Sequence, residues 1–185
     1  GLEPTEVIEK HLVPAMRTGG EKFEKGEYFL IDLMMAAEAM RAASSILTAS
    51  MSEQGRQRLK HEKTGTVVIG TVKGDLHDIG KNLVAMMLEV NGFEVSDIGV
   101  DRSAREFIDK GNDVGADIIG LSALMTTTLS HQAEVIQFLN GFGLRDRFKV
   151  IVGGGATSEA WAKIQADAWA PDAIAAVVTA KKMVK

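Results

Sequence analysis

Residue types that could do chemistry gather first in the stretch Gly74–Gly80, which reads GDLHDIG. His77 stands two residues after Asp75, so the carboxylate can accept a hydrogen bond from the imidazole Nδ1–H. Such a bond fixes the tautomer and leaves Nε2 as a more basic donor for a metal or a proton. The plainer interpretations are a solvated loop histidine and a helix cap by Asp75. The adjacent carboxylate and the framing glycines favour a functional role.

Two further stretches place hydroxyls and glycines directly after apolar runs. They are Ser122–Thr128, which reads SALMTTT, and Gly153–Gly155. Hydroxyl groups alone are weak evidence, and three glycines can form a plain tight turn. Glycines that follow a strand also let a ligand approach the backbone closely, because no side chain stands in the way.

Several common chemistries are disfavoured by motifs that the sequence lacks. There is no phosphate-binding G-x-x-x-x-G-K-[ST] loop, no G-x-G-x-x-G after the first apolar run and no G-x-S-x-G elbow. The chain has no cysteine, which excludes disulfides and thiolate chemistry. One histidine and one aspartate are too few for a zinc site, whereas a metal held in a macrocycle needs only one axial protein donor.

The composition is that of a globular protein with a sizeable core. The 185 residues are 45% hydrophobic and carry a formal net charge of −4, so the basic surface expected of a nucleic-acid-binding protein is missing. No apolar run approaches the roughly 20 residues that span a bilayer, and the acidic N-terminal residues do not resemble a signal peptide. We therefore expect a cytoplasmic protein with no nucleic-acid or membrane partner.

The elements that must position these stretches are alternating strands and helices from residue 66 onward. Five such units predict an α/β fold with a five-stranded parallel sheet that is covered on both faces. Right-handed crossovers make it a doubly wound, flavodoxin-like or Rossmann-like sheet. The predicted strands are 66–72, 93–100, 117–124, 149–152 and 168–170, and the predicted helices are 79–90, 103–110, 129–139, 158–166 and 171–183.

In a 2-1-3-4-5 strand order, the first, third and fourth strands are neighbours. The three polar and glycine-rich stretches follow those strands, at their carboxyl ends. Open α/β sheets bind ligands outside the carboxyl ends of their strands. We therefore expect the three stretches to meet in one crevice.

The N-terminal part is expected to be helical. Pro4 suits a first helical position, Pro14 should interrupt or restart the helix, and apolar residues recur at helical spacing from Tyr28 to Leu47. A small helical bundle is the predicted result. A polar run from Ser50 to Gly65 indicates a connector. The expected organisation is a helical cap domain at 1–58, a linker at 59–65 and an α/β domain at 66–185.

The motifs resemble the signature of cobalamin-binding domains. Residues 75–80 match its D-x-H-x-x-G element, 122–124 its S-x-L element and 153–154 its GG element, in that order. Residues 23–30, FEKGEYFL, and the helix after them are similar to the cap that precedes this domain in methionine synthase and in corrinoid proteins of anaerobic methyltransferase systems. The resemblance covers nearly the whole chain.

The resemblance implies a role for each matching residue. His77 would be the lower axial ligand of cobalt, after the cofactor's own dimethylbenzimidazole base is displaced. Asp75 would hydrogen-bond His77, and Thr128, where methionine synthase has serine, would complete this relay. Phe23 and Leu30 would cover the upper corrin face, although bundle core is the plainer interpretation for both. The implied cofactor-binding set is Phe23, Leu30, Asp75, His77, Ile79, Gly80, Ser122, Leu124, Thr126, Gly153 and Gly154, with Ser122, Leu124 and Thr126 lining a slot for the nucleotide tail and the two glycines leaving room for it.

As a function, the resemblance implies a corrinoid methyl carrier that catalyses little alone. Its cofactor would be cobalamin or a related corrinoid, cycling between methylcobalamin and cob(I)alamin. Its partners would be a substrate-specific methyltransferase, a second methyltransferase that uses tetrahydrofolate or coenzyme M, and a reductive activation protein.

Three alternatives stay open. The first is the cobalamin-binding small subunit of a mutase or aminomutase, which would prefer adenosylcobalamin and lack the cap. The second is a cobalamin-dependent regulatory module, although no DNA-binding module is visible in the sequence. The third is a flavin-binding electron carrier, which would be yellow rather than red.

Overall fold

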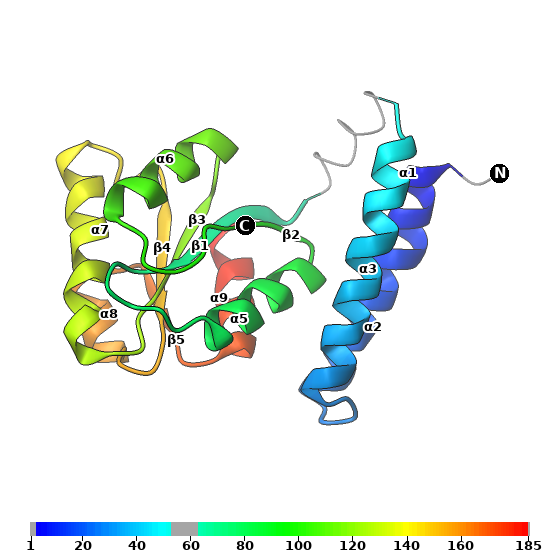
Figure 1. Cartoon of the computed structure of the whole chain (residues 1–185), viewed down its shortest axis with the longest axis horizontal. Coiled ribbons are helices and arrows are strands. Elements are labelled where there is room, and N and C mark those ends of the chain that lie inside the picture. Colours follow the sequence, from blue (N-terminus) through cyan, green and yellow to red (C-terminus); the bar gives the residue numbers. More distant parts are fainter. Residues whose placement is uncertain (1–2, 53–62, 185) are drawn as a thin grey trace. The chain divides into compact units, whose positions relative to one another are not determined.

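The computed structural model describes residues 3–52 and 63–184, which fall into two compact units (Figure 1). The helical unit comprises Gly1–Lys63 with Glu89–Gly92, and the sheet unit comprises Thr64–Leu88 with Phe93–Lys185. The domain boundaries expected from the sequence stay a prediction, and residues 59–62 of the expected linker lie outside the described residues. Within the described ranges, no helix is both long and apolar enough to cross a membrane.

The helical unit begins with a helix that changes its hydrogen-bonding pattern before Pro14. Helix α1 (Pro4–Val7) continues as a π-helical turn, η1 (Ile8–Leu12), and then as α2 (Val13–Glu24). Val13 N–H bonds the carbonyl of Ile8, five residues back. Pro14 has no N–H to offer the preceding turn. The predicted interruption at Pro14 is therefore a π-helical turn ahead of the proline, and the chain stays helical.

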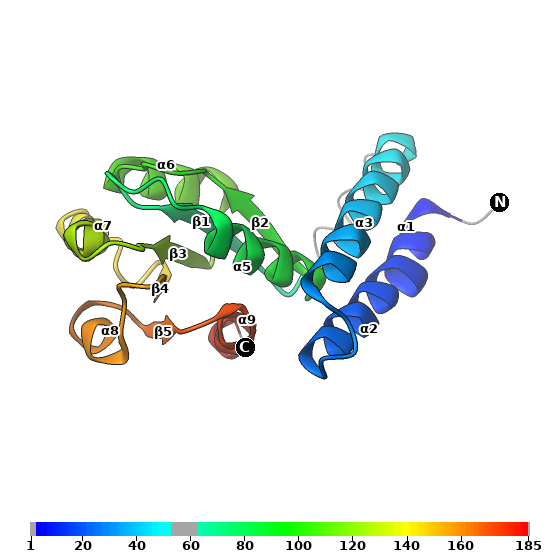
Figure 2. The same ribbon diagram turned by 60° about the horizontal axis from the view of Figure 1, so that its bottom comes forward.

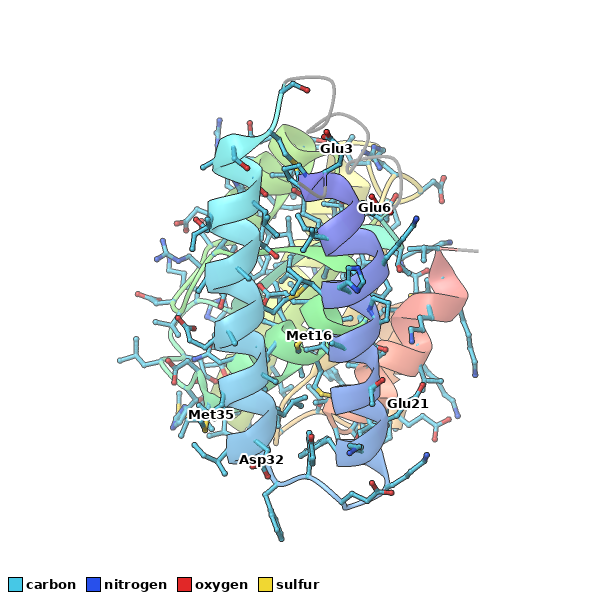
Figure 3. The ribbon with its side chains drawn as sticks, turned by 90° about the vertical axis from the view of Figure 1, so that its right-hand side faces the viewer. Glu3, Glu6, Met16, Glu21, Asp32 and Met35 are labelled. Carbon is cyan, nitrogen blue, oxygen red and sulfur yellow. The ribbon has the colours of Figure 1, made fainter. Side chains whose placement is uncertain are left out.

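Helix α3 (Leu30–Ser50) packs beside α2 and buries only part of its predicted apolar stripe. The Asp32 carboxylate accepts the N–H of Phe29 at 2.9 Å, which caps the start of the helix. Leu33 is fully buried, whereas Leu30 is 40% exposed. Figure 3 looks onto these helices, with Met16 between them and Met35 on the side of α3 away from α2.

The sheet unit has the predicted architecture. Its five strands are all parallel and lie in the order β2-β1-β3-β4-β5. Helices α5 and α9 cover one face, and α6, α7 and α8 cover the other (Figure 2). The elements are β1 (Gly65–Thr71), α5 (Ile79–Val90), β2 (Phe93–Asp97), α6 (Ala104–Val114), β3 (Ile118–Ser122), the 3₁₀ turn η2 (Thr126–Thr128), α7 (Leu129–Gly141), β4 (Lys149–Gly153), α8 (Glu159–Gln165), β5 (Ala168–Ala170) and α9 (Ala173–Met183).

Several elements differ by a few residues from their predicted limits, and in β2 and α6 the local reason is visible. Strand β2 ends at Asp97, because the Asp97 side chain accepts the N–H of Gly99 at 2.8 Å and Gly99 turns the chain with a φ of 88°. Helix α6 extends to Val114, where Gly115 ends it in the left-handed conformation. In both cases a glycine with a positive φ, Gly99 or Gly115, follows the end of the element.

Candidate functional site

Asp75 lies in the loop between β1 and α5 and is fully buried. Its Oδ1 accepts the backbone N–H of His77 at 3.1 Å and lies 2.7 Å from His77 Nδ1. Its Oδ2 accepts the N–H of Leu124 at 2.8 Å, the N–H of Met125 at 3.3 Å and the hydroxyl of Thr128 at 2.9 Å. One carboxylate therefore joins the loop after β1 to the loop after β3.

The charge of Asp75 follows from these contacts. Burial by itself would raise the pKa of Asp75, but the hydrogen bonds from His77, Leu124 and Thr128 outweigh it and hold the pKa well below its ordinary value. An ionised carboxylate can only accept, so Nδ1 of His77 carries the hydrogen. Neutral His77 then has its lone pair on Nε2, the ring nitrogen left for a metal or a proton.

Thr128 is buried and reaches two acceptors with one hydroxyl. Its Oγ1 lies 2.9 Å from Asp75 Oδ2 and 2.9 Å from the carbonyl of Met125. Because a hydroxyl has a single hydrogen, only one of these bonds is made at a time. The structure thus brings together the three residues predicted as a relay, and their role in catalysis stays a prediction.

A pocket of about 530 Å³ opens at the carboxyl ends of the strands, between α5 and α9. Its volume lies within the usual range of small-molecule sites. His77, with its side chain 52% exposed, lines it. The predicted residues that line it are His77, Ile79, Gly80, Ser122, Leu124, Gly153 and Gly154.

The other predicted residues lie elsewhere. Asp75 is buried and contacts His77, whereas Thr126 is exposed on η2 and does not line the pocket. Phe23 and Leu30 belong to the helical unit, where Phe23 is half-buried and Leu30 exposed. Their predicted position over a corrin ring stays a prediction.

The pocket also extends to the end of β5, which the sequence reasoning did not include. Pro171 and Asp172 line it after that strand, as do Ala173 and Ala176 of α9. Two signals could have found them. Strand β5 neighbours β4, so its carboxyl end lies at the same edge, and alanines three residues apart share one helix face. The small side chains of Ala173 and Ala176 leave room in the pocket, which Gly153 of β4 also lines.

Large apolar side chains stand exposed beside the pocket. Leu76 is 70% exposed, Ile79 is 83% exposed and Leu124 is 46% exposed, and all three line the cavity. Apolar groups gathered at a cavity in this way mark a binding surface. Gly80 adds room, because a Cβ placed there would meet no atom within 4 Å.

Lys81 is a second feature that the sequence reasoning missed. It lines the pocket, yet its side chain is only 1% exposed and forms an ion pair with Asp97. Its ammonium group also donates to the Asn82 side chain at 2.6 Å. A buried lysine needs such partners. The pair ties the start of α5 to the end of β2.

Gly154 permits a close contact that another residue would break. A Cβ on Gly154, whose φ is 106°, would lie 2.2 Å from the carbonyl oxygen of Ala123. We predict that Gly154→Ala lowers the free energy of unfolding by about 3 kcal/mol or more, because backbone must move and the conformation is strained. Gly143→Ala is the control, since Gly143 has a φ of 67° but open space around it; it should cost about 1 kcal/mol. Equal losses in urea unfolding would refute the close contact.

Comparisons with known proteins agree with this geometry. Two family profiles, each described as a B12 binding domain, match residues 65–178 and 1–48. The chain is 50% identical over 183 residues to the dimethylamine corrinoid protein of Methanosarcina barkeri, covering 98% of this chain and 84% of that protein.

Two solved structures from Methanosarcina barkeri are also similar. The first is the methanol:cobalamin methyltransferase complex, at 28% identity and a TM-score of 0.87 over 100% of this chain and 69% of that chain. The second is the monomethylamine corrinoid protein, at 34% identity and a TM-score of 0.62 over 98% of this chain and 84% of that chain.

Proposed function

The chain belongs to the family of B12-binding corrinoid proteins, and we propose that it carries a methyl group on a corrinoid bound in the pocket between α5 and α9. The observation that carries the proposal is His77, presented beside this pocket with its tautomer set by buried Asp75. The matched relatives are corrinoid proteins, which favours the carrier over the mutase subunit and the regulatory module.

The residues present fit a corrinoid on three observations. The strand residues at the pocket floor include Gly120, Ser122 and Gly153 beside Ile69 and Ile151, and the three small residues leave depth for the nucleotide tail. Gly80 faces open space, as expected where a ligand approaches the backbone. The exposed apolar side chains beside the cavity suit the largely apolar face of a macrocycle.

A bound corrinoid supplies a cobalt centre that accepts and releases a methyl group. Within the chain, Nε2 of His77 would ligate that cobalt. The same nitrogen can hold a proton instead, but it cannot do both at once. Nδ1 of His77 is bonded to the ionised carboxylate of Asp75, so a His77 that leaves the cobalt would have Nε2 free to take up a proton. Thr128 can donate to the second carboxylate oxygen of Asp75, which also accepts the N–H of Leu124.

We further propose dimethylamine as the methyl donor, held by a substrate-specific methyltransferase. This rests on the relative at 50% identity, a dimethylamine corrinoid protein. The acceptor would be tetrahydrofolate or coenzyme M on a second methyltransferase. A reductive activation protein would return oxidised cobalt in the carrier to the cob(I)alamin state. The organisation into domains 1–58 and 66–185, and a location in the cytoplasm, stay part of this proposal.

The test has two stages. The full chain, mixed with hydroxocobalamin and passed through gel filtration, should emerge red with about one corrinoid per chain. The reduced carrier is then offered dimethylamine, monomethylamine or methanol, each with the methyltransferase specific for it. We expect the methylated absorption spectrum to form with dimethylamine. Colourless protein would refute corrinoid binding. If the methylated spectrum formed with methanol and its methyltransferase but not with dimethylamine, the proposed donor would be refuted.

A further inference from the structure

Gln132 is a fully buried polar residue on α7, and the site described so far does not use it. Its helix faces the sheet with apolar side chains, among them Val135, Ile136 and Leu139. Burying an amide without hydrogen-bond partners is strongly unfavourable. A leucine or methionine would fill the same space at no such cost, so the partners of the amide need an explanation.

Those partners account for the whole amide. The Nε2 group donates to the carbonyl of Leu121 at 3.0 Å and to the carbonyl of Gly153 at 3.1 Å. Oε1 accepts the indole N–H of Trp161 at 3.0 Å. Two acceptors on one side and one donor on the other fix the orientation of the amide, because only NH₂ can bond carbonyls.

The two carbonyls belong to neighbouring strands beneath the pocket. Leu121 lies one residue before the end of β3, and Gly153 ends β4, where it pairs with Ser122. Leu121, Ser122 and Gly153 all line the pocket. Helix α7 lies on the opposite face of the sheet from α5 and α9 (Figure 2). Gln132 therefore joins the ends of β3 and β4 from behind the pocket floor.

A second chain of hydrogen bonds supports the next residue of the same loop. The indole N–H of Trp169 donates to the hydroxyl of Thr157 at 3.1 Å. That hydroxyl donates to the carbonyl of Gly154 at 2.6 Å. Both tryptophans of the chain are half-buried. The indole of Trp161 bonds Gln132 and that of Trp169 bonds Thr157, and these two side chains in turn bond the carbonyls of Gly153 and Gly154.

We propose that Gln132 is a positioning residue that sets the spacing between β3 and β4 at the pocket floor, and so determines whether the nucleotide tail of a corrinoid fits. The inference rests on the proposed function, because the tail must enter this pocket. Gln132 acts through the strand ends and does not touch the ligand. It should therefore matter for a corrinoid with a tail and not for one without.

The experiment compares cobalamin with cobinamide, which keeps the corrin ring but lacks the nucleotide tail. Gln132→Met keeps the volume and removes all three hydrogen bonds. Arg147→Met is the matched control. Arg147 also donates to a backbone carbonyl, that of Ala116, but at the amino end of β3, away from the pocket floor. We expect Gln132→Met to release cobalamin about tenfold faster, because the strand ends lose the hydrogen bonds that hold them. Release of cobinamide, and of both corrinoids from Arg147→Met, should change less than about twofold.

Gln132→Glu provides a second variant if the methionine variant does not fold. Its carboxylate can still accept from Trp161, but it would oppose the carbonyls of Leu121 and Gly153. Burial raises the pKa of such a carboxyl, and its protonated form can donate one hydrogen bond. Cobalamin release should therefore be faster at high pH in this variant only, and cobinamide release should not follow.

The outcomes separate this inference from the proposed function. If the unsubstituted chain binds neither corrinoid, the proposed function fails, and this inference fails with it. If that chain binds both, and the Gln132 variants release cobalamin and cobinamide equally fast or release neither faster, the proposed function stands and the role of Gln132 is refuted.

Discussion

Replacing His77 with alanine is expected to remove the protein nitrogen from the cobalt of bound cobalamin and to weaken corrinoid binding by at least about tenfold. The imidazole is set for this contact, because Nδ1 lies 2.7 Å from a buried carboxylate oxygen and the side chain lines the pocket. Alanine leaves that carboxylate without its imidazole partner and leaves the cobalt without a donor from the chain. The absorption spectrum of the bound cobalt(III) corrinoid should change accordingly.

The chain contains a matched control for this change. His131 also places Nδ1 2.7 Å from a carboxylate, that of Glu134, but it does not line the pocket. His131→Ala removes the same kind of pair and should leave corrinoid affinity and spectrum unchanged. If His77→Ala kept the spectrum and affinity of the unsubstituted chain, His77 would not be the ligand.

The second large effect is expected from Asp75→Asn, which should lower the free energy of unfolding by about 3 kcal/mol. Both carboxylate oxygens accept hydrogen bonds, Oδ1 from His77 and Oδ2 from Leu124 and Thr128 among others. An asparagine NH₂ placed on either side would face donors with its own donors. Because the site is fully buried, water cannot relieve the conflict. Urea unfolding at neutral pH measures the loss.

The pH dependence of stability gives an independent check on Asp75. Its folded pKa is lowered from the ordinary value of 3.8, so the folded protein prefers the ionised form. That contribution is fully present above the unfolded pKa and is lost as pH falls through the lower folded pKa. Asp75→Asn should lack this contribution, so the stability gap between the two proteins should narrow as pH falls below about 4.

Asp78→Asn is the control in the same loop. Asp78 is exposed, and its carboxylate accepts a 3.2 Å bond from the Asn82 side chain. Its replacement should change the free energy of unfolding by less than about 0.5 kcal/mol. An Asp75→Asn protein as stable as this control, with an unchanged pH profile, would contradict the hydrogen-bond arrangement around Asp75.

The parts of the fold that local patterns determine could be predicted from the sequence. Helix α5 has the predicted limits, Ile79 to Val90, because its apolar spacing ends at an Asn-Gly pair. The doubly wound parallel sheet followed from alternating strands and helices with right-handed crossovers, and its strand order is the one under which the three stretches were expected to meet. The end of β2 at Asp97 was missed, since it depends on a side chain that bonds the backbone two residues later.

In the site too, contacts between residues close in sequence could be predicted, and contacts between distant residues could not. The contact between Asp75 and His77 was predictable, because the residues are two apart on one loop. Thr128 reaches Asp75 from another loop, and only the family resemblance suggested that contact. Gln132 carried no sequence signal, because a glutamine on an amphipathic helix is most often exposed and only the packing of α7 on the sheet buries it.

The most direct test of the account is an electron paramagnetic resonance spectrum of cobalamin in the cobalt(II) state, bound to the chain with its four histidines labelled with ¹⁵N. Nitrogen-15 as the axial ligand splits each cobalt line in two, whereas natural nitrogen splits it in three. We predict the two-line pattern, and its disappearance in His77→Ala. A three-line pattern in the labelled protein would show that the cofactor's own base remains on the cobalt, and it would contradict ligation by His77.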